Sequence, residues 1–441
     1  MIQDLTRGNL ERVRNPSLRA YAERYLEIYE AFEEAVQQAG LPLEPPGRNG
    51  EAQDLRAELR ARGASFRNAD HSIHLGPLSP ACEACRMGVG TATFFASLKC
   101  HRRCFYCFNP NQEGYDFFQE HRRDLGAELA ELAEGGFQVS HVALTGGEPL
   151  LHPEEAVTFF RTAKQLFPGV HTRLYTSGDH LGEALVRQLA EAGLDEVRVS
   201  VRVDDGPAGR RHTYSRLALA REHIPAVMVE TPVLPGTLDA MTEMLLELDR
   251  IGIFGVNLLE FCFPFHNAEA FRERGYQVKN PPYEVPYDYW YAGGLPVAGS
   301  EVDALRLVKF ALDQGLSLGV HYCSLENKHS GQIFRQNSTA SLPATACFSA
   351  RDFFIRSAKV FGRDALRSRR RFDALGYRGY AVDPVRDFLE FHPAWIPQLR
   401  GVADEVALCT YVAEERPEGP VLRELKISVT TPGTFDPETD I

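Results

Sequence analysis

The sequence predicts an α/β protein built on a partial (β/α)6 TIM-like barrel. Between residues 91 and 263, β-rich segments alternate with helical segments six times. Such alternation is typical of parallel strands joined by helices. Six units fall short of the eight of a complete (β/α)8 barrel, so we expect an incomplete barrel.

The individual elements support this prediction. The first predicted strand is TATFFASL and the sixth is GVNLLEFCF. The strands between them are HVALTGGEP, HTRLYTSG, DEVRVSVRV and IPAVMVETP. The expected helices span 116–134, 181–192 and 238–250, and another begins near Pro153, which fits the first turn of a helix. Residues 263–300 show no periodicity and predict a lid or binding loop, followed by a helix at 301–314.

The chain is expected to have three parts. Residues 1–80 form an N-terminal helical extension, because YAERYLEIYEAFEEAVQQ has apolar residues at helical spacing. Residues 81–335 form the barrel core, including a C-x2-C segment. Residues 336–441, with basic helices and two further strand-like segments, form a C-terminal accessory region.

Composition restricts the function classes. The 441 residues are 44% hydrophobic and 24% charged, as in an ordinary globular protein. The net charge of -12 disfavours broad nucleic-acid binding. The run Arg367, Arg369, Arg370 and Arg371 is either a solvated helix face or a contact for an acidic substrate or an RNA. No long apolar run or signal-peptide core is present, so we expect no membrane association and a cytoplasmic location.

Three of the nine cysteines, Cys100, Cys104 and Cys107, lie within eight residues directly after the first strand. Without an export signal, clustered cysteines indicate metal or redox chemistry rather than disulfides. A structural zinc site needs four ligands, and His101 is poorly placed to be the fourth. A [4Fe–4S] cluster held by three thiolates keeps one iron open for another molecule.

The spacing C-x3-C-x2-C resembles that of radical S-adenosylmethionine (SAM) enzymes, and Tyr106 fits the aromatic position before the third cysteine. A second motif, Thr145-Gly146-Gly147-Glu148-Pro149, ends the second strand. The resemblance covers about residues 90–265 and implies an oxidoreductase-type radical SAM barrel. It implies that the open iron binds SAM, that an electron from the cluster cleaves it, and that the 5′-deoxyadenosyl radical abstracts hydrogen from a substrate.

The resemblance also implies SAM contacts. The turn residues Gly146, Gly147, Glu148 and Pro149 are expected to bind the methionyl amine. Ser177, at the end of the third strand, is expected at the ribose. Further candidates are Arg202 for the SAM carboxylate and Glu230 and Asn257 for adenine.

For several of these candidate residues, a purely structural role is an alternative to ligand binding. Arg198 and Arg202 are expected to share one face of the fourth strand, where a ligand or barrel carboxylates could pair with them. Asn257 and Glu260 could contact adenine or substrate, or make structural hydrogen bonds.

The remaining cysteines suggest a second site. Cys82 and Cys85 form a C-x2-C pair, a common ligand spacing, 15 residues before Cys100. If Cys323 and Cys347 meet them in space, the four could hold an auxiliary Fe–S cluster or zinc; otherwise they are free thiols. Cys262 and Cys409 lie in apolar stretches and are expected to be buried.

The order PACEAC, KCHRRCFYC, TGGEP and VHYCS, the last followed by Lys328, resembles a largely uncharacterised radical SAM family related to pyruvate-formate-lyase activating enzyme. This similarity covers about residues 75–335. The leading hypothesis is an enzyme acting on a small molecule or a peptide, with flavodoxin or ferredoxin as electron donor. The alternatives are an activase of a partner protein, a tRNA-modifying enzyme and a non-catalytic metal-binding protein.

Overall fold

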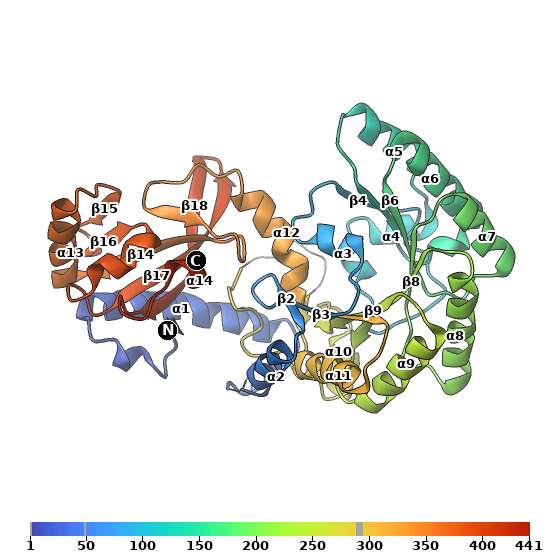
Figure 1. Ribbon diagram of the computed structural model, residues 1–441, viewed down its shortest axis with the longest axis horizontal. Helices are drawn as coiled ribbons and strands as arrows, with labels where there is room; N and C mark the ends of the chain where they lie inside the picture. The colour runs from blue at the N-terminus through green and yellow to red at the C-terminus, as the bar shows by residue number, and fades with distance from the viewer. Residues whose placement is uncertain (1, 48–49, 288–293) are drawn as a thin grey trace. The chain divides into compact units, whose positions relative to one another are not determined.

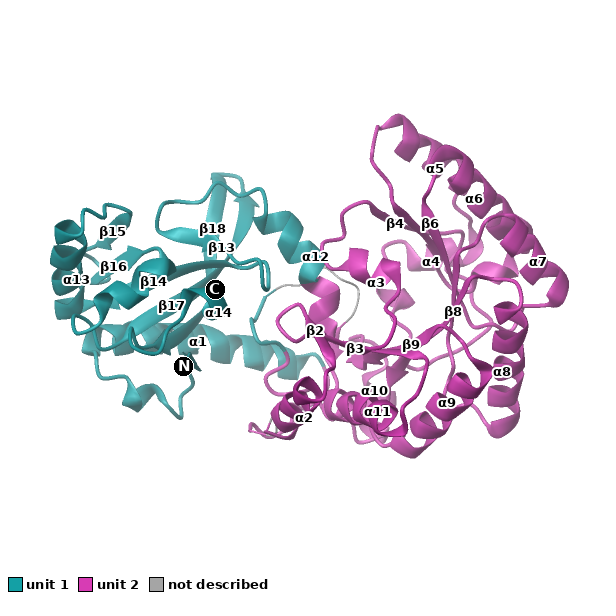
Figure 2. Cartoon of the chain, viewed as in Figure 1, with its two compact units in different colours: residues 1–39, 283–289, 330–441 teal, residues 40–282, 290–329 magenta. Residues whose placement is uncertain are grey.

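The computed structural model describes residues 2–47, 50–287 and 294–441 and divides the chain into two units (Figures 1 and 2). Unit 2 comprises residues 40–282 and 290–329. Unit 1 comprises residues 1–39, 283–289 and 330–441. This division differs from the expected three parts, because the first 39 residues belong with the C-terminal region and only the following residues belong with the barrel.

Unit 2 contains a nine-stranded sheet with the order β2-β3-β12-β9-β8-β7-β6-β5-β4. Strands β4 to β9 and β12 run parallel, whereas β3 and β2 are antiparallel additions at one edge. Their bounds are β2 (Ser65–Arg67), β3 (Ser72–Leu75), β4 (Thr91–Phe95), β5 (His141–Thr145), β6 (His171–Thr176), β7 (Glu196–Val199), β8 (Ala226–Val233), β9 (Gly255–Glu260) and β12 (Gly319–Cys323). The partial barrel predicted from the sequence is confirmed, and a seventh parallel strand, β12, extends it.

Helices join the parallel strands. They are α5 (Leu125–Glu134), α6 (Pro153–Leu166), α7 (Glu183–Glu191), α8 (Pro207–Arg221), α9 (Leu238–Ile251) and α11 (Ser300–Gln314). The single helix expected over 116–134 is instead two helices, α4 (Tyr115–Glu120) and α5. The carboxylate of Asp124 accepts a hydrogen bond from the Ala127 backbone N–H at 3.0 Å. Asp124 therefore caps a new helix rather than continuing the old one.

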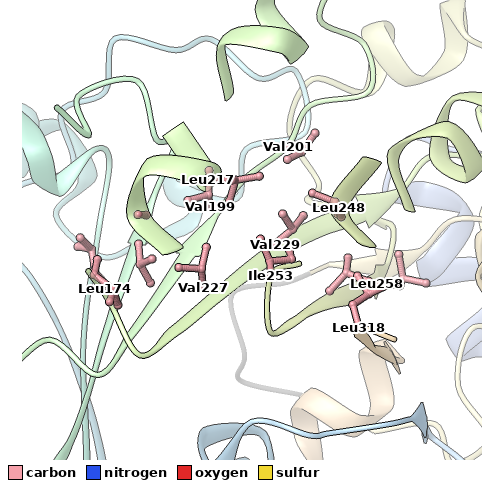
Figure 3. Packing of buried hydrophobic residues seen from close by; sticks show 14 of the residues in the cluster. Leu174, Val199, Val201, Leu217, Val227, Val229, Leu248, Ile253, Leu258 and Leu318 are labelled. Atoms are coloured by element: carbon pink, nitrogen blue, oxygen red, sulfur yellow. The ribbon is translucent and has the colours of Figure 1, made fainter. Parts of the chain in front are cut away.

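The two faces of the parallel sheet differ in chemistry. Leu174, Val199, Val229 and Leu258 point to the helix-covered face and are fully buried in one apolar cluster (Figure 3). Because successive strand residues point to opposite faces, their neighbours point to the other face, which we call the inner face. That face carries charged and polar side chains, including Tyr175, Arg198, Glu230 and Asn257. The apolar strand residues are thus buried against the surrounding helices, and the charged and polar strand residues lie on the inner face.

The segment expected to be a lid contains short elements. Strand β10 (Cys262–Phe263) pairs with β11 (Leu295–Pro296), and α10 (Ala268–Glu273) lies between them in the sequence. Residues 288–293 of this segment lie outside the described residues, and its role as a lid stays a prediction.

Unit 1 is built on a seven-stranded antiparallel sheet of order β1-β18-β17-β14-β16-β15, with β13 paired to β14. The strands are β1 (Gln3–Asp4), β13 (Ala346–Phe348), β14 (Ile355–Phe361), β15 (Tyr380–Asp383), β16 (Phe388–Phe391), β17 (Val406–Arg416) and β18 (Gly419–Thr430). Helix α1 (Pro16–Gln38) buries Leu18 and Leu26 in the same core as Ile355 and Ile427. This shared core explains why the N-terminal helix belongs to the C-terminal unit.

The arginine run lies on helix α13 (Gly362–Ala374) of unit 1. Arg367 reaches the Asp364 carboxylate at 3.4 Å, as expected for a solvated helix face. Among the described residues, no helix is long and apolar enough to cross a membrane.

Replacing Leu248 with Ala should destabilise the protein by about 2–5 kcal/mol, because its side chain is fully buried between α9 and the sheet and would leave a cavity. Denaturant unfolding measures this loss. Leu246→Ala, on the same helix but 46% exposed, is the matched control and should cost much less. Equal losses for both variants would contradict the described packing.

Candidate active site

The three-cysteine loop follows β4 directly. Cys104 and Cys107 are half-buried and Cys100 is exposed. The Cys107 backbone N–H donates to the Cys104 carbonyl at 3.1 Å, which folds the second half of the motif into a turn. Burial raises the pKa of each thiol, and Cys104 raises the pKa of both Cys100 and Cys107 further. The three thiols are therefore electrostatic neighbours on one loop.

The glycine turn after β5 is fastened to this loop through the backbone. The Gly147 N–H donates to the Ser97 carbonyl at 3.1 Å, and the Glu148 N–H donates to the Lys99 carbonyl at 2.8 Å. Gly146 has φ +127°, and a Cβ at Gly147 would lie 2.0 Å from the Lys99 oxygen. The sequence motif predicted glycines that admit a ligand; in the structure both glycines admit the backbone of the cysteine loop.

Glu148 joins two strand ends. Its buried carboxylate accepts hydrogen bonds from the Thr176 hydroxyl at 2.7 Å and from the Ser177 hydroxyl and N–H at 2.6 and 2.8 Å. It also accepts from the Leu150 N–H at 3.1 Å, at the start of a short 3-10 helix opened by Pro149. The structure thus brings together two residues predicted to contact SAM, Glu148 and Ser177. The Glu148 carboxylate orients the serine through these hydrogen bonds.

An ion network missed by the sequence analysis anchors the middle of the cysteine loop. Asp179, two residues after Ser177, accepts from His101 at 2.6 Å and from Arg102 at 2.6 and 2.7 Å. Arg102 also pairs with Asp205 at 3.0 Å. Burial would raise the pKa of Asp179, but the hydrogen bonds from Arg102 and His101 hold it well below its usual range. The available signal was the pair His101-Arg102 between two cysteines and a carboxylate after the TSG turn.

The expectation that Arg198 and Arg202 share a face of one strand is wrong, because β7 ends at Val199. Arg202 lies in the following turn and pairs with Asp204 at 2.7 Å. Burial raises the pKa of Cys104, and the positive charge of Arg202 partly offsets this rise. Arg202 therefore lies beside the cysteine loop.

Arg198 does lie on the inner face and is almost fully buried. It pairs with Glu196 and with Glu230, both at 2.5 Å. The barrel carboxylates predicted as an alternative therefore satisfy part of the Arg198 guanidinium, which also donates to the Ser79 hydroxyl and to Cys82 Sγ, both at 3.1 Å.

The other predicted adenine contacts extend this network. The Glu230 carboxylate accepts from the Asn257 amide at 2.8 Å. Burial would raise the pKa of Glu230, but Arg198 and Asn257 hold it below its usual range. Glu260 instead accepts from Lys279 at 2.7 Å and from the Leu325 N–H, which favours its structural interpretation. Tyr106 packs edge-on against Phe105 and Phe261, linking the cysteine loop to the end of β9.

The second group of cysteines is divided. Cys82 and Cys85 lie on α3 (Pro80–Cys85), and Cys323 ends β12, all in unit 2. Burial, with smaller contributions from Cys85 and Cys82, raises the pKa of Cys323 to about 12. Cys347 lies on β13 in unit 1, so the expected four-cysteine set is split between the two units. Cys409 is buried as expected, whereas Cys262 is only half-buried.

Neither cysteine group is preformed for a single ion. Across residues 2–47, 50–287 and 294–441, no three His, Cys, Asp or Glu side chains converge closely enough to hold one metal ion. A zinc ion would need such convergence.

Comparison with known proteins agrees with this geometry. Residues 96–248 match the family described as the Radical SAM superfamily. A Methanocaldococcus jannaschii protein, MJ0021, whose description as a glycyl-radical enzyme activating enzyme is provisional, is 27% identical over 56% of this chain and 63% of its own length. A PqqA peptide cyclase of Xanthomonas campestris is 34% identical over 32% of this chain and 37% of its own. The chain thus matches less than two thirds of each relative's length.

Among solved structures, SuiB of Streptococcus suis bound to the precursor peptide SuiA is similar, with a TM-score of 0.34 and 13% identity. That similarity covers 47% of this chain and 43% of SuiB.

Together with this match, the cysteine loop after the first parallel strand and the glycine turn hydrogen-bonded to it after the second identify residues 96–248 as a radical SAM domain. The homology of the chain to MJ0021 confirms the resemblance to the family related to pyruvate-formate-lyase activating enzyme.

Replacing Gly147 with Ala should displace the cysteine loop, because the new methyl group would overlap the Lys99 carbonyl. Iron retained after anaerobic reconstitution and desalting should fall by about four atoms per chain, the content of one [4Fe–4S] cluster. Gly182→Ala is the control, since a Cβ there meets nothing within 4 Å. Wild-type iron content in the Gly147 variant would show that close packing of the glycine turn on the cysteine loop is not needed to hold iron.

Proposed function

We propose that this chain holds a [4Fe–4S] cluster through Cys100, Cys104 and Cys107, reductively cleaves SAM there, and abstracts hydrogen from a peptide or small-molecule substrate. The observation that carries the proposal is the pair of backbone hydrogen bonds between the cysteine loop and the TGGEP turn. These two segments follow the adjacent parallel strands β4 and β5. Each motif alone has other uses, but their attachment at one sheet edge fits a cofactor site.

The residues present fit the cluster. Three neighbouring thiols on one loop match three of the four irons, and a fourth coordination position would remain for SAM. When bound, the cluster supplies one electron that breaks a carbon–sulfur bond of SAM, giving methionine and a 5′-deoxyadenosyl radical that leaves as 5′-deoxyadenosine after taking hydrogen from substrate.

The chain's own residues would position SAM around this loop. Glu148 fixes the Ser177 hydroxyl at the rim of the site, in the position proposed for the ribose. Arg202, beside Cys104, supplies a cation for the SAM carboxylate if it exchanges Asp204 for the ligand. Gly146, Gly147 and Pro149 shape the turn proposed for the amine, while Tyr106 closes the loop against Phe261. Glu230 and Asn257 remain proposed adenine or substrate contacts on the inner face.

The relatives favour a peptide or protein substrate. One is a PqqA peptide cyclase, and MJ0021 is described as acting on a glycyl-radical enzyme. Hydrogen abstraction from a peptide is therefore the leading proposal, and activation of a partner protein by forming a glycyl radical is the second. The net charge of -12 opposes the RNA alternative. A low-potential flavodoxin or ferredoxin is the proposed electron donor.

Replacing Cys104 with Ala should abolish SAM cleavage, because two remaining thiolates cannot secure the cluster. The assay is 5′-deoxyadenosine formation after anaerobic iron–sulfide reconstitution with SAM and dithionite. Cys347→Ala, in the other unit, should cleave SAM as the wild type does. Undiminished cleavage by the Cys104 variant would refute the proposed function.

Replacing Arg202 with Ala should raise the Kd for SAM about tenfold, the expected cost of one charge-assisted hydrogen bond. Isothermal titration under anaerobic conditions measures it, alongside Tm. Arg187→Ala, which removes an exposed helix-surface ion pair with Glu183, is the control. If Arg202→Ala lowers Tm and leaves the SAM affinity intact, Arg202 is structural.

A further inference from the structure

A second set of thiols gathers in unit 2, away from the three-cysteine loop. Cys82 and Cys85 are three residues apart on α3 and so lie on one side of that helix. Cys323 is buried at the end of β12, within electrostatic range of both. Cys323 lies two residues after His321 on β12, so both side chains point to the inner face of the sheet.

Hydrogen-bond donors are aimed at two of these sulfurs. The Arg198 guanidinium donates to Cys82 Sγ at 3.1 Å, and the Asn327 amide donates to Cys323 Sγ at 3.2 Å. Arg198 is itself fixed by Glu196 and Glu230, so its direction is set by the barrel. Charged and amide donors toward sulfur stabilise a thiolate ligand and tune a bound cluster, and a packed neutral thiol does not need them.

The adjacent inner face contains two polar atoms that lack a hydrogen-bond partner among the described residues. They are Asn257 Oδ1 and His321 Nδ1, on side chains 4% and 3% exposed. The two residues are direct neighbours across β9 and β12. His321 is oriented by a 2.8 Å contact between its Nε2 and the Ser72 hydroxyl. Buried polar atoms without partners are costly, so this face is built to meet a group beyond the protein's own side chains.

We propose that Cys82, Cys85 and Cys323 bind a second iron–sulfur cluster, facing the polar row formed by Asn257 and His321. Zinc fits less well, because a structural zinc site closes all four positions with protein ligands and this group offers three thiols. Three thiolates again leave one iron for a further ligand on the inner face. Cys347 takes no part. The inference goes beyond SAM cleavage and does not depend on it.

The test removes the first cluster and looks for the second. In the variant Cys100→Ala, Cys104→Ala, Cys107→Ala, anaerobic reconstitution should leave about four irons and four sulfides per chain, with cluster absorbance and an EPR signal after reduction. Adding Cys323→Ser should remove them, whereas adding Cys347→Ala should not. Circular dichroism and Tm confirm that each variant is folded.

Two results would overturn the proposal. The triple variant could fold but retain no iron or only zinc, or the added Cys323→Ser could leave the iron unchanged. SAM cleavage by the wild type is assayed separately. A failed cleavage assay with iron retained by the triple variant would reject the proposed function and keep the second cluster; cleavage with no retained iron would do the reverse.

Discussion

The candidate site depends on two backbone hydrogen bonds between the cysteine loop and the glycine turn. They join Gly147 to Ser97 and Glu148 to Lys99, and they require the turn to approach closer than any side chain at Gly147 would allow. Adjacent parallel strands β4 and β5 deliver the two segments to the same sheet edge. The thiols are thus placed by backbone geometry, which resists rearrangement better than long side chains would.

The charged inner face follows from the same architecture. Because the strands bury their apolar residues against the helices, the opposite face can hold Arg198, Glu196 and Glu230 as a mutually satisfied group. Buried ions of this kind are expensive unless every member has partners. Their cost is consistent with a face kept for ligands, and the donors from Arg198 and Asn327 to cysteine sulfurs connect it to the second group of thiols.

Asp179 shows how neighbouring strand ends cooperate. It follows β6, reaches back to His101 and Arg102 between the first two cysteines, and shares Arg102 with Asp205 after β7. The ends of three strands, β4, β6 and β7, are thereby joined at one loop, and Glu148, after β5, joins the end of β5 to that of β6. A ligand at this edge would meet a rigid rim assembled from four loops.

The sequence alone determined the barrel class, the three-cysteine loop and the TGGEP turn, because strand periodicity and short motifs are local properties of the chain. Only the tertiary structure decided that Arg202 lies beyond its strand, that Glu148 orients Ser177, and that Asp179 holds Arg102. It also decided that Cys347 and Cys323 belong to different units, and that α1 shares a core with the C-terminal strands. These are contacts between segments distant in sequence, and their partners are set by packing that no local pattern encodes.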